Sequence, residues 1–256
     1  MFQSQRISFT FNWTSFHSTI LSKEASYSII IAFIIMIVWA ISLTFLLHFN
    51  LGQVNFLWIL LGIVWQTFLY TGLFITAHDA MHGLVFPRNP KINNFIGSLC
   101  ILAYALFNYK ELVKKHGLHH HNPASKLDPD FHDEESNNFF IWYFKFMTSY
   151  CNWKQLISLM SLFYSLNYVF HISAINLMLF WVIPPLLSSL QLFYFGTFLP
   201  HREPEGGYTN CHRAQTNPLP VFWSFITCYH FCYHEEHHEY PHLPWWKLPE
   251  AYRRKK

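Results

Sequence analysis

Three short stretches of the chain hold most of its histidines. The chain has 17 histidines, and eleven of them lie in residues 78–82, 116–121 and 230–242. Histidine is the commonest metal ligand in proteins, and its imidazole suits iron, zinc, copper and nickel alike. The chemistry indicated is therefore metal-dependent, and the ligand type alone leaves the identity of the metal open.

The first stretch, HDAMH at 78–82, follows a long apolar run. Its two histidines are four residues apart, so they lie on one face of a helix and can reach the same metal. A pair of interfacial histidines at a membrane surface would have the same spacing. This stretch alone is therefore a weak signal for a metal site.

The other two stretches, HGLHHH at 116–121 and HEEHH at 234–238, share the spacing H-x-x-H-H. In each of them three histidines occupy positions i, i+3 and i+4, which lie on one face of a helix. With the first stretch they supply eight imidazoles, whereas one tetrahedral zinc takes at most four ligands. The sequence therefore predicts two metals. The predicted ligands are His78, His82, His116, His119, His120, His234, His237 and His238.

The third stretch also reads as H-E-x-x-H, the motif of zinc proteases. In that reading Glu235 is the general base, and His234 and His238 are the ligands. One such motif with a third ligand would suffice for a protease. The other two histidine stretches would then have no explanation, which disfavours the zinc protease.

Carboxylates near the histidines are candidates for orienting their rings, because a metal-bound histidine usually donates its second N–H group to an acceptor. Asp79 lies inside the first stretch, and Asp128 and Asp130 belong to DPDFH at 128–132. Ordinary surface charge is the alternative for each of the three. The Glu-x-x-His motif of soluble di-iron bundles does not recur as a pair, so the site predicted here is dominated by histidine.

The elements that must position the histidines are apolar. Apolar residues make up 52% of the chain and charged residues 12%, which is about half the charged share of a soluble domain. No charged residue lies between Glu24 and Asp79 or between Lys154 and Arg202. Each gap can hold two membrane helices of ~20 residues. We predict spans near 27–48, 56–77, 156–175 and 177–199, with turns at 50–53 and at either Asn176 or Pro184-Pro185.

The charges place the histidine stretches on one side of the membrane. Two helical hairpins put residues 1–26, 78–155 and 200–256 on the same side, and these segments hold all 17 Lys and Arg residues. The positive-inside rule makes that side cytoplasmic. We therefore predict an all-α integral membrane protein with four transmembrane helices in two hairpins. Both termini and a histidine-rich di-metal cap are expected in the cytosol.

The remaining segments complete this prediction. The apolar run 92–107 is short for a crossing, so we expect an interfacial or half-inserted helix. Residues 139–151 are expected in the membrane interface, where Trp and Tyr are frequent. No second domain or signal peptide is indicated, so residues 1–256 are expected to form one domain. The five cysteines are odd in number and lack a C-x-x-C pair, which predicts no disulfide framework.

Two other classes of protein are disfavoured. The net charge of +3 gives no reason to expect a nucleic-acid partner. A membrane zinc-binding or transport protein is the alternative of another class. Transporters place ionisable residues inside their spans, and no charged residue lies inside the four spans predicted here.

The histidine stretches and their neighbours resemble a known family. The histidine boxes resemble those of the membrane fatty-acid desaturase and hydroxylase superfamily. Longer strings around them are similar to those of the bacterial and cyanobacterial β-carotene ketolases within that superfamily. These strings are HDAMHG at 78–83, DPDFH at 128–132, FGTFLPHR at 195–202 and HEEHHEYPHLPWW at 234–246.

The resemblance implies an integral membrane enzyme that holds two Fe²⁺ ions with box histidines and uses O₂. It implies electrons from a separate donor, typically ferredoxin with its reductase. A ketolase of this kind oxidises carbon 4 of the β-ionone ring of β-carotene and related carotenoids. Two hydroxylations give a geminal diol that loses water, so β-carotene becomes echinenone and then canthaxanthin. A fatty-acyl desaturase or hydroxylase and a carotenoid 3-hydroxylase share the boxes and remain the alternatives.

The resemblance also implies a ninth ligand, because the family uses a further histidine between the second and third boxes. His201 in FGTFLPHR matches that position, and His212 is the less favoured candidate. His121 departs from a plain H-x-x-H-H box. A shift by one residue would make His116, His120 and His121 the second triplet.

Overall fold

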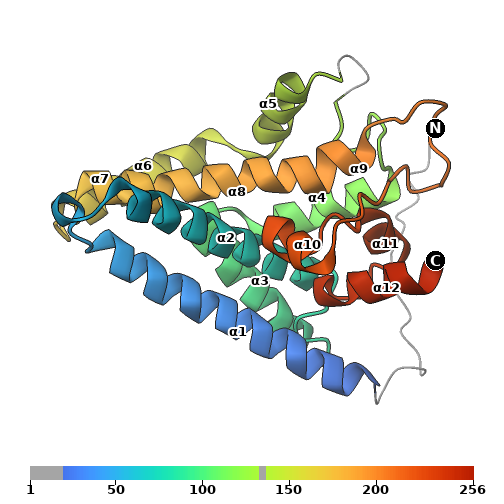
Figure 1. Cartoon of the computed structure of the whole chain (residues 1–256), viewed down its shortest axis with the longest axis horizontal. Coiled ribbons are helices and arrows are strands. Elements are labelled where there is room, and N and C mark those ends of the chain that lie inside the picture. The colour runs from blue at the N-terminus through green and yellow to red at the C-terminus, as the bar shows by residue number, and fades with distance from the viewer. Residues whose placement is uncertain (1–19, 133–136) are drawn as a thin grey trace, which may run out of the picture.

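A computed structural model of the chain describes residues 20–132 and 137–256. Within these ranges the regular structure is helical and no strand occurs. Figure 1 shows the long helices running along the molecule's longest axis, with α4, α9 and α11 at one end. The first 26 residues, for which no signal peptide is expected, lie mostly outside the described ranges.

Within residues 20–132 and 137–256, three helical segments are long and apolar enough to cross a membrane. They are Ser26–Leu47 within α1 (Ile20–Leu47), α2 (Phe56–Met81) and Ala174–His201. Large side chains such as Ile41 and Phe45 are exposed on α1, as lipid contact requires. Three of the four predicted spans are thus confirmed as apolar helices of sufficient length. The segment Ala174–His201 joins α7 (Ala174–Leu177), η2 (Met178–Val182), α8 (Ile183–Phe193), η3 (Tyr194–Phe198) and α9 (Leu199–His201).

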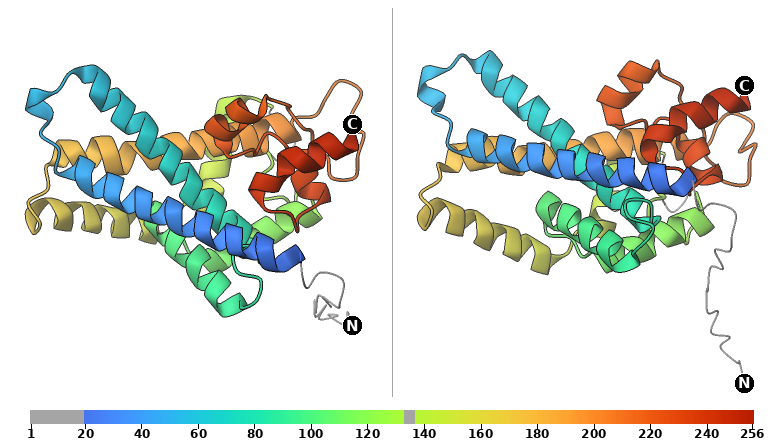
Figure 2. Two further views of the ribbon diagram at one scale, coloured as in Figure 1. Left: turned by 60° about the horizontal axis from the view of Figure 1, so that its bottom comes forward. Right: turned by 90° about the horizontal axis from the view of Figure 1, so that it is seen from below.

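The predicted span at 156–175 is wrong in its bounds. α6 (Trp153–Tyr168) has 16 residues, or about 24 Å of helix, which is shorter than the ~30 Å hydrocarbon core of a bilayer. The chain turns at 169–173, at the same end of the molecule as the turn between α1 and α2 (Figure 2). Pro184-Pro185 is not a turn either, because Pro184 lies in the first turn of α8.

Asn176 lies inside a helix and not in the turn. Its side chain stabilises the end of another helix. It is buried within α7, and its Nδ2 donates to the backbone oxygens of Leu46 at 2.9 Å and Phe49 at 2.8 Å. These carbonyls belong to the end of α1 and the residues after it, where a helix leaves its last acceptors unpaired. A residue that looks like a turn former in sequence thus joins two apolar helices.

α3 (Pro90–Ala105) and α4 (Tyr109–His121) form a pair bent by 99°. Together they pass as a broken span or a re-entrant loop, which agrees with the short helix expected over 92–107. Asn93 fixes α3 against the end of α2 by donating from Nδ2 to the oxygen of Ala80 at 2.7 Å. A Cβ on Gly97 would lie 2.5 Å from the Tyr109 ring and 2.7 Å from the Ala80 Cβ. The close packing of α2, α3 and α4 therefore requires glycine at this position.

The remaining helices cover the end of the molecule where α4 and α9 lie. α5 (Phe139–Tyr150) packs on α8 through Trp142, which is fully buried and whose Nε1 donates to the oxygen of Asp130 at 2.6 Å. Figure 1 shows the C-terminal helices beside α4 and α9. The C-terminal elements are α10 (Val221–Cys228), α11 (His234–Glu239), η4 (Trp245–Lys247) and α12 (Leu248–Lys255). The short element η1 (Leu51–Gln53), between α1 and α2, lies at the opposite end of the molecule.

Candidate metal centre

Among the residues that the structure describes, nine histidines converge in two adjacent groups. Within each group the potential ligand atoms all lie within 4.8 Å of one another. The five-histidine group contains His78, His82, His116, His120 and His237, and the four-histidine group contains His119, His201, His234 and His238. The structure thus brings together all nine histidines predicted as ligands, including His201, which only the family resemblance implied.

Two helices contribute to both groups. α4 gives His116 and His120 to the five-histidine group and His119 to the four-histidine group. α11 gives His237 to the former, and His234 and His238 to the latter. In a helix, residues four apart nearly align, whereas adjacent residues diverge by about 100°. Each H-x-x-H-H box therefore places its i and i+4 rings in one group and its i+3 ring in the other.

Two further helix ends complete the groups. His78 lies in the last turn of α2, and His82 is the C-cap of the same helix. His201 ends α9 directly after η3, a π-helical turn over Tyr194–Phe198. Such π turns are rare in proteins overall, and those that do occur often lie at functional sites. The extra residue rotates the helix end, so this turn sets the direction in which His201 points.

The ring nitrogens approach one another at distances suited to metal ligands. Two nitrogens that are each about 2.1 Å from one metal at a right angle lie about 3 Å apart. The Nε2–Nε2 distances are 2.7 Å for His82–His116, 3.0 Å for His120–His237, 3.0 Å for His201–His234 and 3.1 Å for His119–His238. The nitrogens do not form isolated pairs but converge within each group, as the ligands of one metal ion do.

His78 gives an independent indication that a metal fits here. Its side chain is buried, and neither of its ring nitrogens has a hydrogen-bond partner within residues 20–132 and 137–256. A buried polar group without a partner costs about 1–3 kcal/mol. A metal ion in the five-histidine group would satisfy one of these nitrogens. The all-imidazole donor set suits a transition metal rather than calcium or magnesium, which take oxygen ligands.

The third-box histidines are held in the form that binds metal. Burial, followed by repulsion from neighbouring imidazoles, lowers the pKa of His234, His237 and His238 well below the usual range for histidine. A lowered pKa means that these rings are neutral at pH 7. A neutral ring has a free lone pair for coordination, so no proton must be displaced before a metal binds.

Asp128, one of the three carboxylates predicted to orient a histidine ring, contacts His119. His119 donates from Nδ1 to Asp128, whose two carboxylate oxygens both lie at 3.0 Å. The carboxylate also accepts from the backbone N–H groups of Ala124 and Asp130, each at 2.9 Å. This contact directs Nε2 of His119 into the four-histidine group, which is the arrangement typical of metal-bound histidine.

The other two expected carboxylates are placed differently. Asp130 lies 3.6 Å from Nδ1 of His119, and it accepts the phenol O–H of Tyr150. Burial raises the pKa of Asp130 to about 6. The prediction that Asp79 orients a histidine is not met. Its Oδ1 lies 3.8 Å from Nδ1 of His78, beyond hydrogen-bonding distance, and its Oδ2 accepts the N–H of Trp245 at 3.2 Å. As the neighbour of His78 on α2, Asp79 points about 100° away from that ring, towards the C-terminal segment.

The alternative residues lie outside the two groups. His121 is exposed and donates from Nδ1 to the oxygen of Gly117 at 2.6 Å. The ring of His212 lies 6.0 Å from that of His238, and His212 belongs to neither group. Glu235 accepts from Nζ of Lys255 at 2.6 Å on the outer side of α11. The geometry thus disfavours both the shifted second triplet and the zinc-protease reading, which needs Glu235 beside the metal.

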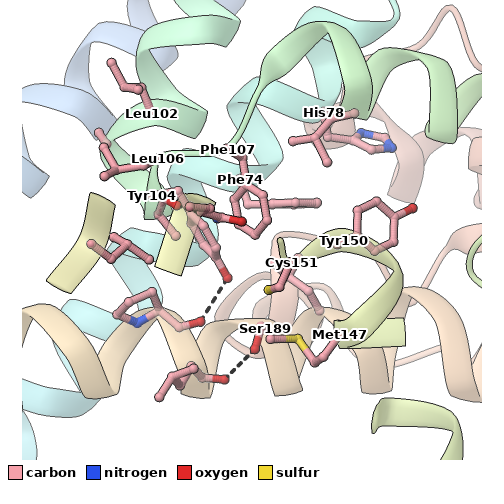
Figure 3. Close-up of a pocket in the computed structure, with 18 of the residues that line it drawn as sticks. Phe74, His78, Leu102, Tyr104, Leu106, Phe107, Met147, Tyr150, Cys151 and Ser189 are labelled. Atoms are coloured by element: carbon pink, nitrogen blue, oxygen red, sulfur yellow. Dashed lines mark hydrogen bonds between the residues drawn. The ribbon is translucent and has the colours of Figure 1, made fainter. Parts of the chain in front are cut away.

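A cavity of about 910 Å³ extends from the histidines into the helical bundle. This volume is near the upper end for sites that bind small molecules. Its walls are mainly apolar, and Figure 3 shows Phe74, Tyr104 and Phe107 among the side chains around it. One end is lined by His78 and His116 of the five-histidine group, and by His119 and His234 of the four-histidine group. A molecule in this cavity would therefore reach both groups.

Comparison with known proteins gives one family. A family model described as fatty acid desaturase matches residues 53–256. The chain is 43% identical over 188 residues to a zeaxanthin 4-ketolase of Chlamydomonas reinhardtii, covering 72% of this chain and 42% of the algal protein. It is 42% identical over 192 residues to β-carotene 4-ketolase 3 of Haematococcus lacustris, covering 73% and 59%. It is 37% identical over 199 residues to a β-carotene ketolase of Paracoccus sp. (strain PC1), covering 75% and 77%. The chain thus spans about half the length of the algal relatives.

Proposed function

The chain belongs to the fatty acid desaturase family, and we propose that it is a β-carotene 4-ketolase. The reaction oxidises carbon 4 of each β-ionone ring to a ketone, giving echinenone and then canthaxanthin. The observation that carries the proposal is the apolar cavity that ends on four histidines, two from each group. The relatives named above, which act on β-carotene or zeaxanthin by their names, support the choice of substrate.

We propose that the nine histidines hold two Fe²⁺ ions, one in each group. Bound iron with O₂ supplies the oxidising chemistry that an unactivated ring C–H bond requires. The neutral imidazoles of the third box and the orphaned nitrogens of His78 support metal binding. Asp128 contributes by holding His119 in the tautomer that leaves Nε2 free.

The residues of the cavity bind and orient the carotenoid. Aromatic walls such as Phe74 and Phe107 provide an apolar surface for a ring and its polyene chain. Because His78, His116, His119 and His234 form one end, a ring that enters first meets both groups. The mainly apolar walls offer water few hydrogen-bond partners. Each geminal diol formed at carbon 4 loses water to leave the ketone.

Expression in a bacterium that accumulates β-carotene tests this function. We expect pigment chromatography to show echinenone and canthaxanthin. A parallel strain that accumulates zeaxanthin measures whether a ring already hydroxylated is accepted, as the name of the Chlamydomonas relative suggests. Zeaxanthin formed from β-carotene would identify a 3-hydroxylase. Unchanged carotenoids with altered acyl chains would identify a fatty-acyl desaturase or hydroxylase.

We further propose that the histidine groups and both termini face the cytosol, where ferredoxin and its reductase would supply the electrons. All 17 Lys and Arg residues lie outside the three apolar segments, which supports this orientation. The start of α1 and the C-terminal helix α12 lie at the same end of the molecule as α9 (Figure 1). The two-hairpin arrangement is modified by the short α6, which reaches only part of the way across.

A reporter fused after Lys256 tests the orientation. We expect a fluorescent protein at this position to be active and an alkaline phosphatase to be inactive, because the first matures in the cytoplasm and the second needs the periplasm. The matched control carries the same reporters between Asn50 and Gln53, in the turn at the opposite end, where the two activities should be reversed. Phosphatase activity only in the C-terminal fusion would contradict the proposed orientation.

A further inference from the structure

A continuous path of hydrogen bonds joins the outer edges of two rings in the four-histidine group. His201 donates from Nδ1 to the backbone oxygen of Arg213 at 2.8 Å. The guanidinium of Arg213 donates from Nη1 to the backbone oxygen of Ala124, also at 2.8 Å. The N–H of Ala124 donates to Asp128, which accepts from Nδ1 of His119. Arg213 thus connects the loop after α9 to the loop after α4, behind the four-histidine group.

The direction of these hydrogen bonds fixes the state of both rings. A backbone carbonyl only accepts, so Nδ1 of His201 must carry the proton. A carboxylate that already accepts two backbone N–H groups likewise requires a proton on Nδ1 of His119. In both rings Nδ1 is thereby committed to the outer partner, and Nε2 points into the four-histidine group. The path therefore sets the tautomer and orientation of two of its four potential ligands.

Two residues of the path have a backbone conformation that non-glycine residues rarely adopt. The φ angle is +44° at Arg213 and +49° at Ala124, in the left-handed region. Asn210 holds the first of these in place, because its backbone oxygen accepts the N–H of Arg213 at 3.2 Å. Its side chain also exchanges hydrogen bonds with the backbone of Ala214. Such strain persists where the surroundings enforce it, and it is concentrated at functional sites.

Arg213 also lies beside Tyr208, a second residue that contacts His201. Its guanidinium carbon lies 5.8 Å from the centre of the Tyr208 ring, within the range of a cation–π interaction. The phenol of Tyr208 donates to the backbone oxygen of His201 at 2.6 Å. His201 is thus held by two separate contacts. Arg213 contacts its ring, and Tyr208, which lies against Arg213, contacts its backbone.

We propose that Arg213 is a positioning residue that orients His201 and His119 together and thereby sets the metal affinity of the four-histidine group. This inference rests on the proposed function, because it takes that group to bind a metal. Loss of the guanidinium would release the oxygen of Ala124 and loosen both loops. Loss of an outer partner of a metal ligand typically lowers metal affinity 10–100-fold. The path touches no ring of the five-histidine group, so the effect should be confined to one of two sites.

The test compares Arg213→Met with wild type and with Arg88→Met. Methionine keeps a long unbranched side chain but removes every donor, and Arg88 is an exposed arginine on the loop after α2. Each protein is purified in detergent, freed of metal and titrated with Fe²⁺ without oxygen. Mössbauer spectroscopy of isotope-enriched iron then reports how far each of two environments is filled. We expect wild type and Arg88→Met to bind two irons. Arg213→Met should bind one iron with unchanged affinity and the other 10–100-fold more weakly.

Two further variants make the test independent of how well Arg213→Met folds. Arg213→Lys keeps a cationic donor that can reach the oxygen of Ala124, so we expect a smaller loss at the same site. Asp128→Asn disturbs the other end of the path. Combined with Arg213→Met, it should cost less than the two single losses together, because residues on one hydrogen-bond path are not independent.

The outcomes separate this inference from the proposed function. Full occupancy of both sites in Arg213→Met with wild-type affinity would overturn the positioning role. So would equal weakening of both sites, or strictly additive losses with Asp128→Asn. A wild-type protein that binds no second iron would instead contradict the proposed di-iron function, and the role of Arg213 with it.

Discussion

Replacing His120 by alanine is expected to abolish ketone formation, whereas replacing His121 by alanine should leave it near the wild-type level. The two residues are neighbours on α4 and differ in where their rings point. His120 belongs to the five-histidine group, with its Nε2 at 3.0 Å from that of His237. His121 is exposed and contacts the backbone of its own helix. Because both changes have the same effect on helix propensity, the comparison isolates what each ring contacts.

The measurement is pigment composition in the β-carotene-accumulating strain, together with the iron content of each purified variant. Near-normal canthaxanthin from His120→Ala, or complete loss in His121→Ala, would show that the second triplet has been assigned wrongly. His201 and His212 form a second such pair. His201→Ala is expected to lose iron and activity, and His212→Ala to keep both. The reverse result would transfer the ninth position to His212.

Filling the cavity is expected to abolish ketone formation while leaving the iron content unchanged. Ala103 on α3 lines the cavity, so Ala103→Trp would put a large ring where the carotenoid lies in the proposed function. None of the nine histidines is touched by this change. The smaller side chain of Ala103→Leu should reduce conversion partially, because it fills less of the same space.

Ile92→Trp is the matched control for the cavity. It introduces the same ring on the same helix, at a position that is exposed and outside the cavity. We expect it to keep wild-type conversion. Normal conversion by Ala103→Trp protein that retains its iron would show that the carotenoid does not occupy this cavity. Loss of iron in the same variant would point to altered folding, and Ala103→Leu then decides the question.

The apolar helices could be predicted from sequence because charges are absent over long stretches. The two gaps, Glu24 to Asp79 and Lys154 to Arg202, locate α1, α2 and the segment Ala174–His201. The bounds of the span predicted at 156–175 could not be obtained in this way. Hydropathy continues through 169–173, where the chain actually turns. The role of Asn176 depends on α1 lying beside α7, which only the folded chain shows.

The histidines of the centre could be predicted from sequence, but their division between two groups could not. Spacing of i, i+3 and i+4 places three rings on one broad face of a helix. That face contributes to both histidine groups only because α4 and α11 lie opposite each other, with His119 and His237 each facing away from its two box partners. Sequence spacing describes one helix at a time, so this interleaving is visible only in three dimensions.

The outer contacts of the rings were predictable only in part. Asp128 was expected from its place near a histidine box, and it does accept from His119. Asp79 was expected on the same reasoning, but it accepts from Trp245 instead. Arg213 gives no signal in the sequence. It acts through its own backbone oxygen and through that of Ala124, and backbone acceptors have no residue type that a motif could reveal.

The metal content of active protein is the sharpest test of the proposed two-iron centre. The chain should be purified without oxygen from cells that form canthaxanthin, and its metals counted by elemental analysis alongside its activity. Nine convergent imidazoles in two groups predict about two irons per chain, because one site with four to six ligands cannot use them all. One zinc and no iron in protein that retains full activity would show that the chain is not a di-iron enzyme.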